Sequence, residues 1–166
     1  MSRFALPELE RRWLLSAVPL GTPTRVVEIE DRYLPGPRLR LRAMTGPDGT
    51  TYKLTQKLPA SDGSPGTLTT IYLAADEAVA MHVLEAYVLR KTRASYPPYG
   101  VDVFAGALAG LVLAEAEVGR SAEDLDAVVD PPGTVVEVTQ DVTFTGGSLA
   151  RMTAEGLARA LAAYGL

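Results

Sequence analysis

Charged and apolar residues alternate one by one along several short stretches of the chain. Arg38 to Arg42 reads Arg-Leu-Arg-Leu-Arg, and Leu113 to Val118 places two glutamates between small or apolar residues. This period of two is typical of a β-strand with one polar and one apolar face, whereas a helix repeats every 3.6 residues. The same alternation occurs at Glu8 to Arg12, Tyr52 to Lys57 and Arg90 to Arg93. The pattern predicts that the first two thirds of the chain are mainly strands.

Turn residues separate these runs. Pro35-Gly36-Pro37 and the cluster Ser61 to Gly66 interrupt the alternation. Pro47-Asp48-Gly49 lies between two alternating runs, which predicts a β-hairpin. Consecutive strands joined by short turns pair antiparallel.

Three helices are expected among the strands. Asp76 is a candidate cap for a helix that continues to about Tyr87, and a short helix is expected near Ser121. Ser148 to Ala163 is rich in leucine and alanine and predicts a C-terminal helix. The predicted fold class is therefore α+β, dominated by antiparallel strands.

Composition narrows the chemistry that the chain can perform. The length of 166 residues favours a single domain over positions 1–166. The absence of cysteine excludes disulfides, thiolate metal sites and cysteine nucleophiles, and one histidine, His82, cannot build a multi-histidine site. Any metal would therefore be held by carboxylates. The net charge of -4 argues against sequence-independent binding to nucleic acid or to an anionic membrane.

Hydrophobic stretches along the chain are short. None reaches the roughly eighteen apolar residues of a membrane span, and Trp13 to Leu20 is too short and follows two glutamates, unlike a signal peptide. We therefore expect a cytoplasmic protein without a membrane partner.

The charges are sorted by strand. Acids lie on the first and last of the alternating runs, and bases lie on the three runs between them, including all three lysines. One wet face of a sheet would explain the alternation, but such a face usually mixes signs between neighbouring strands. A barrel of about eight strands encloses room for a small ligand. A lumen lined by both signs would suit a polyphosphate with its divalent cations.

The order of these segments carries a family resemblance. Glu8-Leu9-Glu10-Arg11-Arg12 resembles the N-terminal ExExK motif of the CYTH family, named for class IV adenylate cyclase and thiamine triphosphatase and also called the triphosphate tunnel metalloenzymes. The later segments follow in the family's order: Asp31 to Leu34, Arg40 to Arg42, Tyr52 to Lys57, Lys91 to Arg93, Val101 to Gly106, Leu113 to Glu117, and Glu137 to Asp141 followed by Phe144.

This resemblance implies an antiparallel eight-stranded β-barrel, or tunnel, with a few flanking helices. It implies hydrolysis of a triphosphate, inorganic or a small organic or nucleoside triphosphate, by water activated on Mg²⁺ or Mn²⁺. The implied metal ligands are Glu8, Glu10, Glu115 and Glu117, which with Arg12 form the implied catalytic group. The implied substrate contacts are Arg40, Arg42, Lys57, Lys91, Arg93 and Asp102, with Asp141 as a further candidate. The chain would act as a monomer or a homodimer.

Several positions depart from the family pattern. Arg12 replaces a lysine, and it keeps the charge but cannot act as a base. Gly66 to Ile71 lacks the family's alternating glutamates, so that Leu68 and Thr70 stand where acids are expected, and Thr143 stands where an arginine is common. Fewer ligands would weaken metal binding or alter the substrate.

Three alternatives to a triphosphatase stay open. A phosphate-binding or regulatory protein would keep the tunnel and lose hydrolysis, in line with the depleted Gly66 to Ile71 run. A class IV adenylate cyclase would share the tunnel, and an unrelated β-rich binding module would share only the strands. His82 is interpreted as an ordinary surface or partly buried histidine. Gly146-Gly147-Ser148 is interpreted as a turn that caps a helix, because it lacks the lysine of a phosphate-binding loop.

Overall fold

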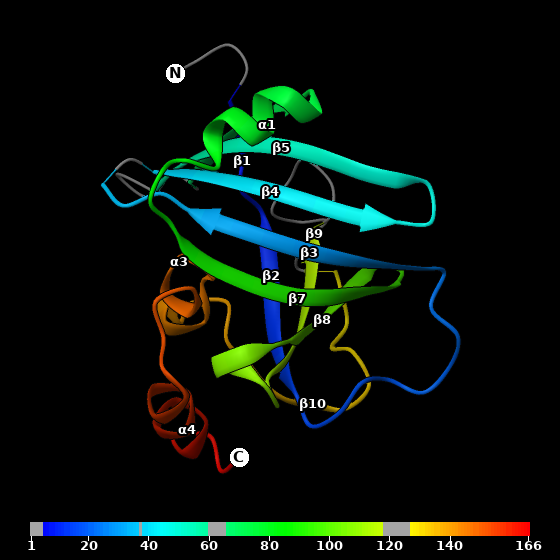
Figure 1. Ribbon diagram of the computed structural model, residues 1–166. Coiled ribbons are helices and arrows are strands. Elements are labelled where there is room, and N and C mark those ends of the chain that lie inside the picture. The colour runs from blue at the N-terminus through cyan, green and yellow to red at the C-terminus, as the bar shows by residue number, and fades with distance from the viewer. Residues whose placement is uncertain (1–4, 37, 60–65, 118–126) are drawn as a thin grey trace.

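Figure 1 shows the computed structural model of the chain, which describes residues 5–36, 38–59, 66–117 and 127–166. Antiparallel strands dominate the structure and short helices lie at its periphery, which confirms the α+β class. The strands are β1 (Leu6–Pro7), β2 (Glu10–Leu15), β3 (Arg25–Tyr33), β4 (Leu39–Gly46), β5 (Gly49–Leu58), β6 (Thr67–Leu73), β7 (Tyr87–Tyr96), β8 (Tyr99–Phe104), β9 (Val112–Glu117) and β10 (Thr134–Glu137). The helical segments are α1 (Ala75–Met81), α3 (Gly146–Leu149) and α4 (Ala154–Ala162), with 3-10 turns η1 (Gly106–Leu108) and η2 (Val142–Phe144). Within the described ranges, no helix has the length and apolar character needed to cross a membrane.

A single sheet contains all of these strands. Their order is β1-β6-β5-β4-β3-β7-β8-β9-β2-β10, and neighbouring strands are antiparallel. β1 lies at one end of this order and β2 lies next to the other end, yet only Glu8 and Leu9 separate them in sequence. A link this short spans at most about 11 Å between the strand ends. The two ends of the sheet must therefore curve toward one another.

The barrel expected from the resemblance is confirmed only in part. The sheet has ten strands, and its hydrogen-bonded order ends at β1 and β10 without closing. β1 has two residues and β10 has four, with an irregular register against β2. The longer strands β2 to β9 match the expected number of eight, but their closure into a barrel is not confirmed.

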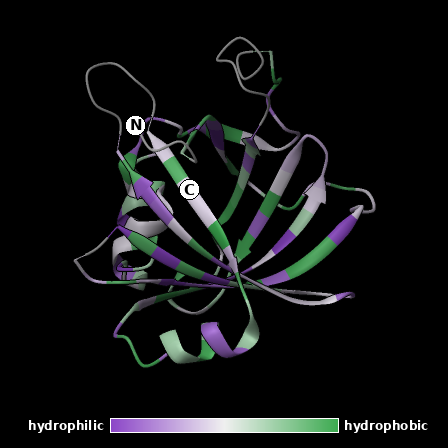
Figure 2. Cartoon of the chain, turned by 90° about the horizontal axis from the view of Figure 1, so that it is seen from above, coloured by the Kyte–Doolittle hydropathy of each residue, from purple (hydrophilic) through white to green (hydrophobic). Residues whose placement is uncertain are grey.

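The alternation along the strands separates the two faces of the sheet (Figure 2). On β2, Trp13 and Leu15 point to the outer face, where they pack with Val101 on β8, Ala114 on β9 and Val128. The indole N–H of Trp13 donates to Asp130, and its ring meets Tyr99 edge to face. The segment around residues 128–130 therefore covers this outer apolar face.

One end of the inner face is apolar and is covered by the C-terminal segment. There Leu14, Phe104 and Leu113 pack with Phe144 and with residues of α3 and α4 in one buried cluster. Figure 1 shows α3 and α4 together beside this end of the strands, near the C-terminus. On the strands that carry these apolar residues the next inward positions are charged: Arg12 before Leu14, Asp102 before Phe104 and Glu115 after Leu113. The C-terminal segment thus closes one end of the inner surface with hydrophobic packing and leaves the charged part beyond it.

The predicted hairpin is confirmed and the predicted helices need correction. Pro47 and Asp48 form the two-residue turn between β4 and β5, and Gly46 pairs with Gly49, whose φ is +107°. α1 starts one residue before Asp76, which does not cap it, and ends at Met81, well before Tyr87. The helix expected near Ser121 lies outside the described residues.

The long C-terminal helix expected from Ser148 to Ala163 is wrong in its continuity. The chain forms α3 and α4 separately, because Thr145 and Thr153 each provide a hydroxyl oxygen that accepts the N–H three residues later. The threonine side chain competes with the preceding helical turn for this N–H and starts a new helix. Gly146-Gly147-Ser148 therefore forms the first turn of α3, in agreement with its interpretation as a helix-capping segment.

Two adjacent glycines of α3 differ sharply in the space around them. A Cβ on Gly146 would lie 2.0 Å from the hydroxyl oxygen of Tyr33, whereas a Cβ on Gly147 would meet nothing closer than 3.8 Å. We predict that Gly146→Ala lowers the free energy of unfolding by about 1 to 3 kcal/mol through overpacking. Gly147→Ala should be neutral or slightly stabilising, because alanine favours helix over glycine. Urea unfolding measures both, and equal stabilities would contradict the tight contact with Tyr33.

Candidate active site

Charged side chains from most of the longer strands meet on the inner face of the sheet, next to its apolar end. Their cross-strand register places opposite signs side by side, with Arg12 opposite Glu115, Arg93 opposite Asp102 and Arg42 opposite Asp31. We call this group the inner charged surface. Its members are Glu10 and Arg12 on β2, Asp31 on β3, Arg40 and Arg42 on β4, Lys53 and Lys57 on β5, Lys91 and Arg93 on β7, Asp102 on β8, and Glu115 and Glu117 on β9.

Asp102 connects two of the predicted phosphate-binding residues. Its carboxylate is fully buried and accepts from Arg93 Nε and Nη2, at 2.6 Å each, and from Lys91 Nζ. Arg93 Nη2 also donates to Glu115. Burial alone would lower the pKa of Arg93, but the charges of Glu115 and Asp102 and their hydrogen bonds raise it above its usual value. Arg93 is therefore firmly protonated and shared between two acids.

Asp31 makes a similar connection on β3, the strand next to β7, and the site prediction missed it. Its carboxylate is fully buried and accepts from Arg42 Nε at 2.6 Å and from Arg42 Nη2 at 2.7 Å. Arg40 Nε lies 3.6 Å from the same carboxylate. Burial opposes ionisation of Asp31, yet the hydrogen bond and charge of Arg42, with Arg40 and Lys91, lower its pKa overall. Its position opposite Arg42 depends on the β3–β4 register, which the sequence pattern does not specify.

Tyr33 lies two residues after Asp31 on the same face and is also absent from the predicted site. It pairs with Arg40 across the β3–β4 ladder. Burial and the adjacent Asp31 carboxylate raise the pKa of Tyr33 to about 12. Its phenol is therefore neutral and can serve only as a hydrogen-bonding group.

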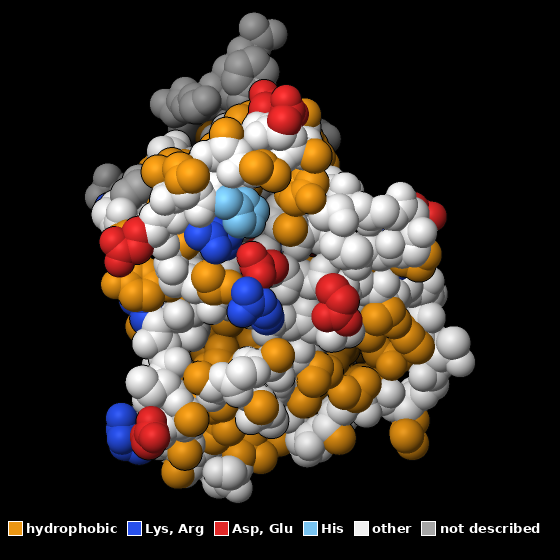
Figure 3. All heavy atoms as spheres, in the orientation of Figure 1, with side chains coloured by type: hydrophobic (Ala, Val, Ile, Leu, Met, Phe, Trp, Pro, Cys, Tyr) orange, Lys and Arg blue, Asp and Glu red, His pale blue; other side chains and the backbone are white. Residues whose placement is uncertain are grey.

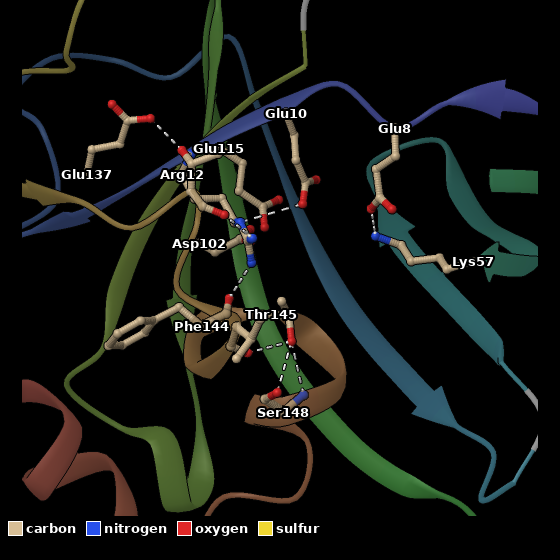
Figure 4. Close-up of polar contacts among 12 residues, drawn as sticks. Glu8, Glu10, Arg12, Lys57, Asp102, Glu115, Glu137, Phe144, Thr145 and Ser148 are labelled. Atoms are coloured by element: carbon tan, nitrogen blue, oxygen red, sulfur yellow. Dashed lines mark hydrogen bonds and ion pairs between the residues drawn. The ribbon is translucent and has the colours of Figure 1, made fainter. Parts of the chain in front are cut away.

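The predicted metal-binding glutamates do not all meet at one point. Glu10, Glu115 and Glu117 line a pocket of about 310 Å³, together with Arg93 and residues 97–100. Glu8 lies apart from them, between β1 and β2, and pairs with Lys57 (Figure 4). Within residues 5–36, 38–59, 66–117 and 127–166, no three acidic or histidine side chains are grouped closely enough to hold a metal ion.

Two glutamates of this pocket, Glu10 and Glu115, differ in the direction of their pKa shifts. Burial and the nearby Glu115 raise the pKa of Glu10, with smaller opposing effects from Lys57 and Arg12. Burial acts in the same direction on Glu115, but Lys91 and Arg93 lower the pKa of this carboxyl well below its usual range. Glu10 thus carries poorly compensated negative charge, which a cation in the pocket would relieve. The donor chemistry fits a hard divalent cation, because such ions prefer carboxylate oxygens.

Arg12 is committed largely to the protein backbone. Its Nη1 donates to the carbonyl of Phe144 at 2.9 Å and its Nη2 donates to the carbonyl of Thr139 at 2.8 Å. Its Nε lies 3.6 Å from Glu10, and only 7% of the residue is exposed. Figure 4 shows the Arg12 side chain reaching past the glutamates toward Phe144. Arg12 therefore joins β2 to the segment that precedes α3.

The remaining candidates have partners that explain them structurally. Asp141 accepts from the backbone N–H of Thr143 at 2.9 Å and from the hydroxyl of Tyr164 at 2.8 Å, so it caps η2 and holds the C-terminus. His82 lies on the outer surface, with Nδ1 2.9 Å from the carbonyl oxygen of Ala78, as an ordinary partly exposed histidine. On β6, Thr70 bonds Thr55 at 2.9 Å. β6 contributes no acid to the inner charged surface.

Comparisons with known proteins agree on the fold. The structure described as the inorganic triphosphatase NE1496 matches with a TM-score of 0.59 and 27% identity, over 89% of this chain and 96% of that chain. This similarity of fold supports the CYTH assignment. A second structure, described as the hypothetical protein NE1496, matches with a TM-score of 0.58 and 28% identity over 88% of this chain and 99% of that chain.

A third structure, with lower sequence identity, shows similarity of the fold alone. The PH1819 protein of Pyrococcus horikoshii OT3 matches with a TM-score of 0.51 and 18% identity, over 71% of this chain and 83% of that chain. No family model matches the chain, and no curated protein matches it significantly. The CYTH assignment therefore rests on the arrangement of strands together with the order of the charged segments.

The contacts of Arg12 predict that this residue contributes to the stability of the fold. Arg12→Met removes both donors to the carbonyls of Thr139 and Phe144 while it keeps much of the side-chain volume. We expect a loss of about 1 to 3 kcal/mol in the free energy of unfolding, because buried carbonyls lose their partners. Urea unfolding measures the loss.

The matched control for Arg12→Met is Arg25→Met. Arg25 pairs with Asp48 at 3.3 Å on the exposed surface, and exposed ion pairs contribute little to stability. A variant Arg12→Met as stable as Arg25→Met would show that the backbone contacts of Arg12 do not support the fold.

Proposed function

We propose that the chain hydrolyses a linear triphosphate, with inorganic tripolyphosphate as the first candidate, in a reaction that requires a divalent cation. The observation that carries the proposal is the pairing of arginines and lysines with carboxylates across one inner surface. Arginine offers fork-shaped donors for phosphate oxygens and lysine offers a compact positive charge. The similarity to a structure described as an inorganic triphosphatase supports the same reaction.

In this proposal the bases of β4, β5 and β7 bind the phosphate chain. Arg40 and Arg42 on β4 and Lys91 and Arg93 on β7 lie on either side of β3, which pairs with both strands. Lys57 completes the set from β5. The strands β2 to β9 then surround the triphosphate as a tunnel that is open toward the pocket lined by Glu10, Glu115 and Glu117.

The carboxylates at that pocket would hold the cation. Glu10, Glu115 and Glu117 are the nearest group, and Glu8 would join them after release from Lys57. A bound Mg²⁺ or Mn²⁺ lowers the pKa of water and neutralises charge on the bridging oxygens. The protein's own residues keep the three negative phosphate groups in line and prevent them from drifting into bulk solvent.

Binding of a triphosphate would exchange the partners of two bases of the inner charged surface. Arg93 pairs with Glu115 and Lys57 pairs with Glu8 in the ligand-free chain. A phosphate oxygen can replace each glutamate as the acceptor, and the released glutamate is then available to a cation. Phosphate binding and cation binding should therefore support one another.

A phosphate-release assay with tripolyphosphate tests the proposal. We expect turnover with Mg²⁺ or Mn²⁺ and none in excess chelator, because in this proposal the bound cation activates the attacking water. Pyrophosphate, thiamine triphosphate and nucleoside triphosphates in parallel define the substrate. Unchanged turnover in chelator would overturn the metal-dependent mechanism.

Matched arginine variants place the activity on the inner face. Arg42→Ala should weaken tripolyphosphate binding by about 1.5 to 3 kcal/mol, the range of a charge-assisted hydrogen bond. Arg90→Ala removes the same charge from the exposed outer face, where Arg90 bonds Glu30 at 2.9 Å, and should leave binding unchanged. Equal effects of the two variants would mean that only overall charge matters.

A non-hydrolytic phosphate-binding protein is the second candidate, and β6 favours it. Leu68 and Thr70 face the inner surface on this strand, where Leu68 pairs with Lys57 and Thr70 with Thr55. Neither can bind a cation as a carboxylate does, so metal positioning is weaker than phosphate binding. Binding of tripolyphosphate without phosphate release under any divalent cation would select this function over hydrolysis.

A further inference from the structure

The buried carboxylate of Asp31 is electrostatically unfavourable for a surface that binds phosphate. It lies at the same register position as Arg42 and is fully buried in the wall formed by β3 and β4. A carboxylate at this place repels an anionic ligand and weakens the attraction of the neighbouring bases. Its presence therefore calls for a role other than ligand attraction.

The geometry of the Asp31 contact is directional. Both carboxylate oxygens are used on one guanidinium, with Nε at 2.6 Å and Nη2 at 2.7 Å. This two-point contact fixes the plane of the Arg42 guanidinium as well as its position. It occupies one edge of the fork and leaves the edge formed by Nη1 and the second hydrogen of Nη2 for another acceptor.

The neighbouring Arg40 depends on the same acid. Its Nε lies 3.6 Å from Asp31 Oδ1, too far for a hydrogen bond, and this buried nitrogen has no hydrogen-bond acceptor among the described residues. Tyr33 on β3 packs closely against Gly146 and pairs with Arg40 on β4. The Asp31 carboxylate thus orients Arg42 by hydrogen bonds and attracts the positive charge of Arg40 without a hydrogen bond.

The next acid on β3 offers a contrast. Glu30 points to the outer face, where it pairs with Arg90 at 2.8 Å among the scattered charges of both signs that Figure 3 shows around the single histidine. Glu30 and Asp31 are adjacent in sequence and each pairs with an arginine of a neighbouring strand. Of these two acids, only Asp31 belongs to the inner charged surface.

We propose that Asp31 is a positioning residue that orients the Arg42 guanidinium for the phosphate chain of the substrate. The proposal rests on the proposed function, because it takes the inner charged surface as the phosphate site. Asp31 does not touch substrate; it acts through Arg42. A role in positioning and a role as a mere counterion predict opposite signs for the effect of neutralising Asp31.

The test is titration calorimetry with sodium tripolyphosphate in chelator, without divalent cations, on the full chain. Asp31→Asn removes one negative charge near the ligand, so a counterion role predicts tighter binding. Positioning predicts weaker binding, by about tenfold, the loss expected when a charge-assisted hydrogen bond is misaligned. Glu30→Gln is the matched control and should change the Kd by less than about twofold, because exposed charges are screened.

Two further variants show whether Asp31 acts through Arg42. In the Arg42→Ala background, Asp31→Asn should no longer weaken binding, since nothing remains to be oriented. Arg42→Lys keeps the charge and loses the fork, so it should also weaken binding by about tenfold. This variant tests the orientation even if Asp31→Asn does not fold, because it leaves the buried acid in place.

The outcomes separate this inference from the proposed function. Tighter or unchanged binding by folded Asp31→Asn, equal weakening in the Arg42→Ala background, or wild-type binding by Arg42→Lys would each overturn the positioning role. Absence of tripolyphosphate binding by the wild-type chain would overturn it together with the phosphate site. Weaker binding by Asp31→Asn in a wild-type chain that releases no phosphate would support the positioning role and contradict hydrolysis.

Discussion

Two buried carboxylates, Asp31 and Asp102, allow the chain to keep a wall of arginines and lysines inside a folded sheet. Taking an unpaired charge out of water costs several kcal/mol, and a row of like charges adds mutual repulsion. Each of these acids is fully buried and bonds its cations through both carboxylate oxygens: Asp31 bonds Arg42, and Asp102 bonds Lys91 and Arg93. Their positions follow from the antiparallel register, which sets each acid opposite a base on the next strand. The curved sheet and the C-terminal segment packed against it then keep these pairs away from bulk solvent.

The acids that pair with bases of the inner charged surface differ in exposure, and this difference has consequences for binding. Asp31 and Asp102 lie behind the bases and have no access to an incoming ion. Glu8 and Glu115 are partly exposed, and each accepts from a base that a phosphate group would also bind. The buried acids therefore fix the shape of the surface, whereas the exposed acids can exchange partners. Exchange costs little, because each lost ion pair is replaced by a pair of the same kind. This division links the electrostatics of folding to the proposed binding of a triphosphate.

Much of this arrangement could be predicted from the spacing of charges, and the rest depends on contacts that spacing does not specify. Alternation correctly separated Arg40 and Arg42 from Leu41, because the side-chain period of a strand is fixed by its backbone. The contact of Asp31 with Arg42 was missed because it depends on the β3–β4 register. The backbone contacts of Arg12 were missed because they join residues 127 and 132 positions apart in the sequence. The C-terminal helix was predicted as continuous because leucine and alanine are frequent from Ser148 to Ala163, although the hydroxyl of Thr153 starts a separate helix.

The central claim is that acids of the inner charged surface hold the bases that a triphosphate would bind. Its most direct test is the metal-free affinity for tripolyphosphate of Glu115→Gln compared with Glu117→Gln. Both variants remove one negative charge from the same pocket, but only Glu115 pairs with Arg93 among the contacts of the described residues. The account predicts that Glu115→Gln tightens binding clearly more than Glu117→Gln, because it also frees Arg93. Equal tightening by the two variants, or no effect of either on a chain that binds tripolyphosphate, would contradict it.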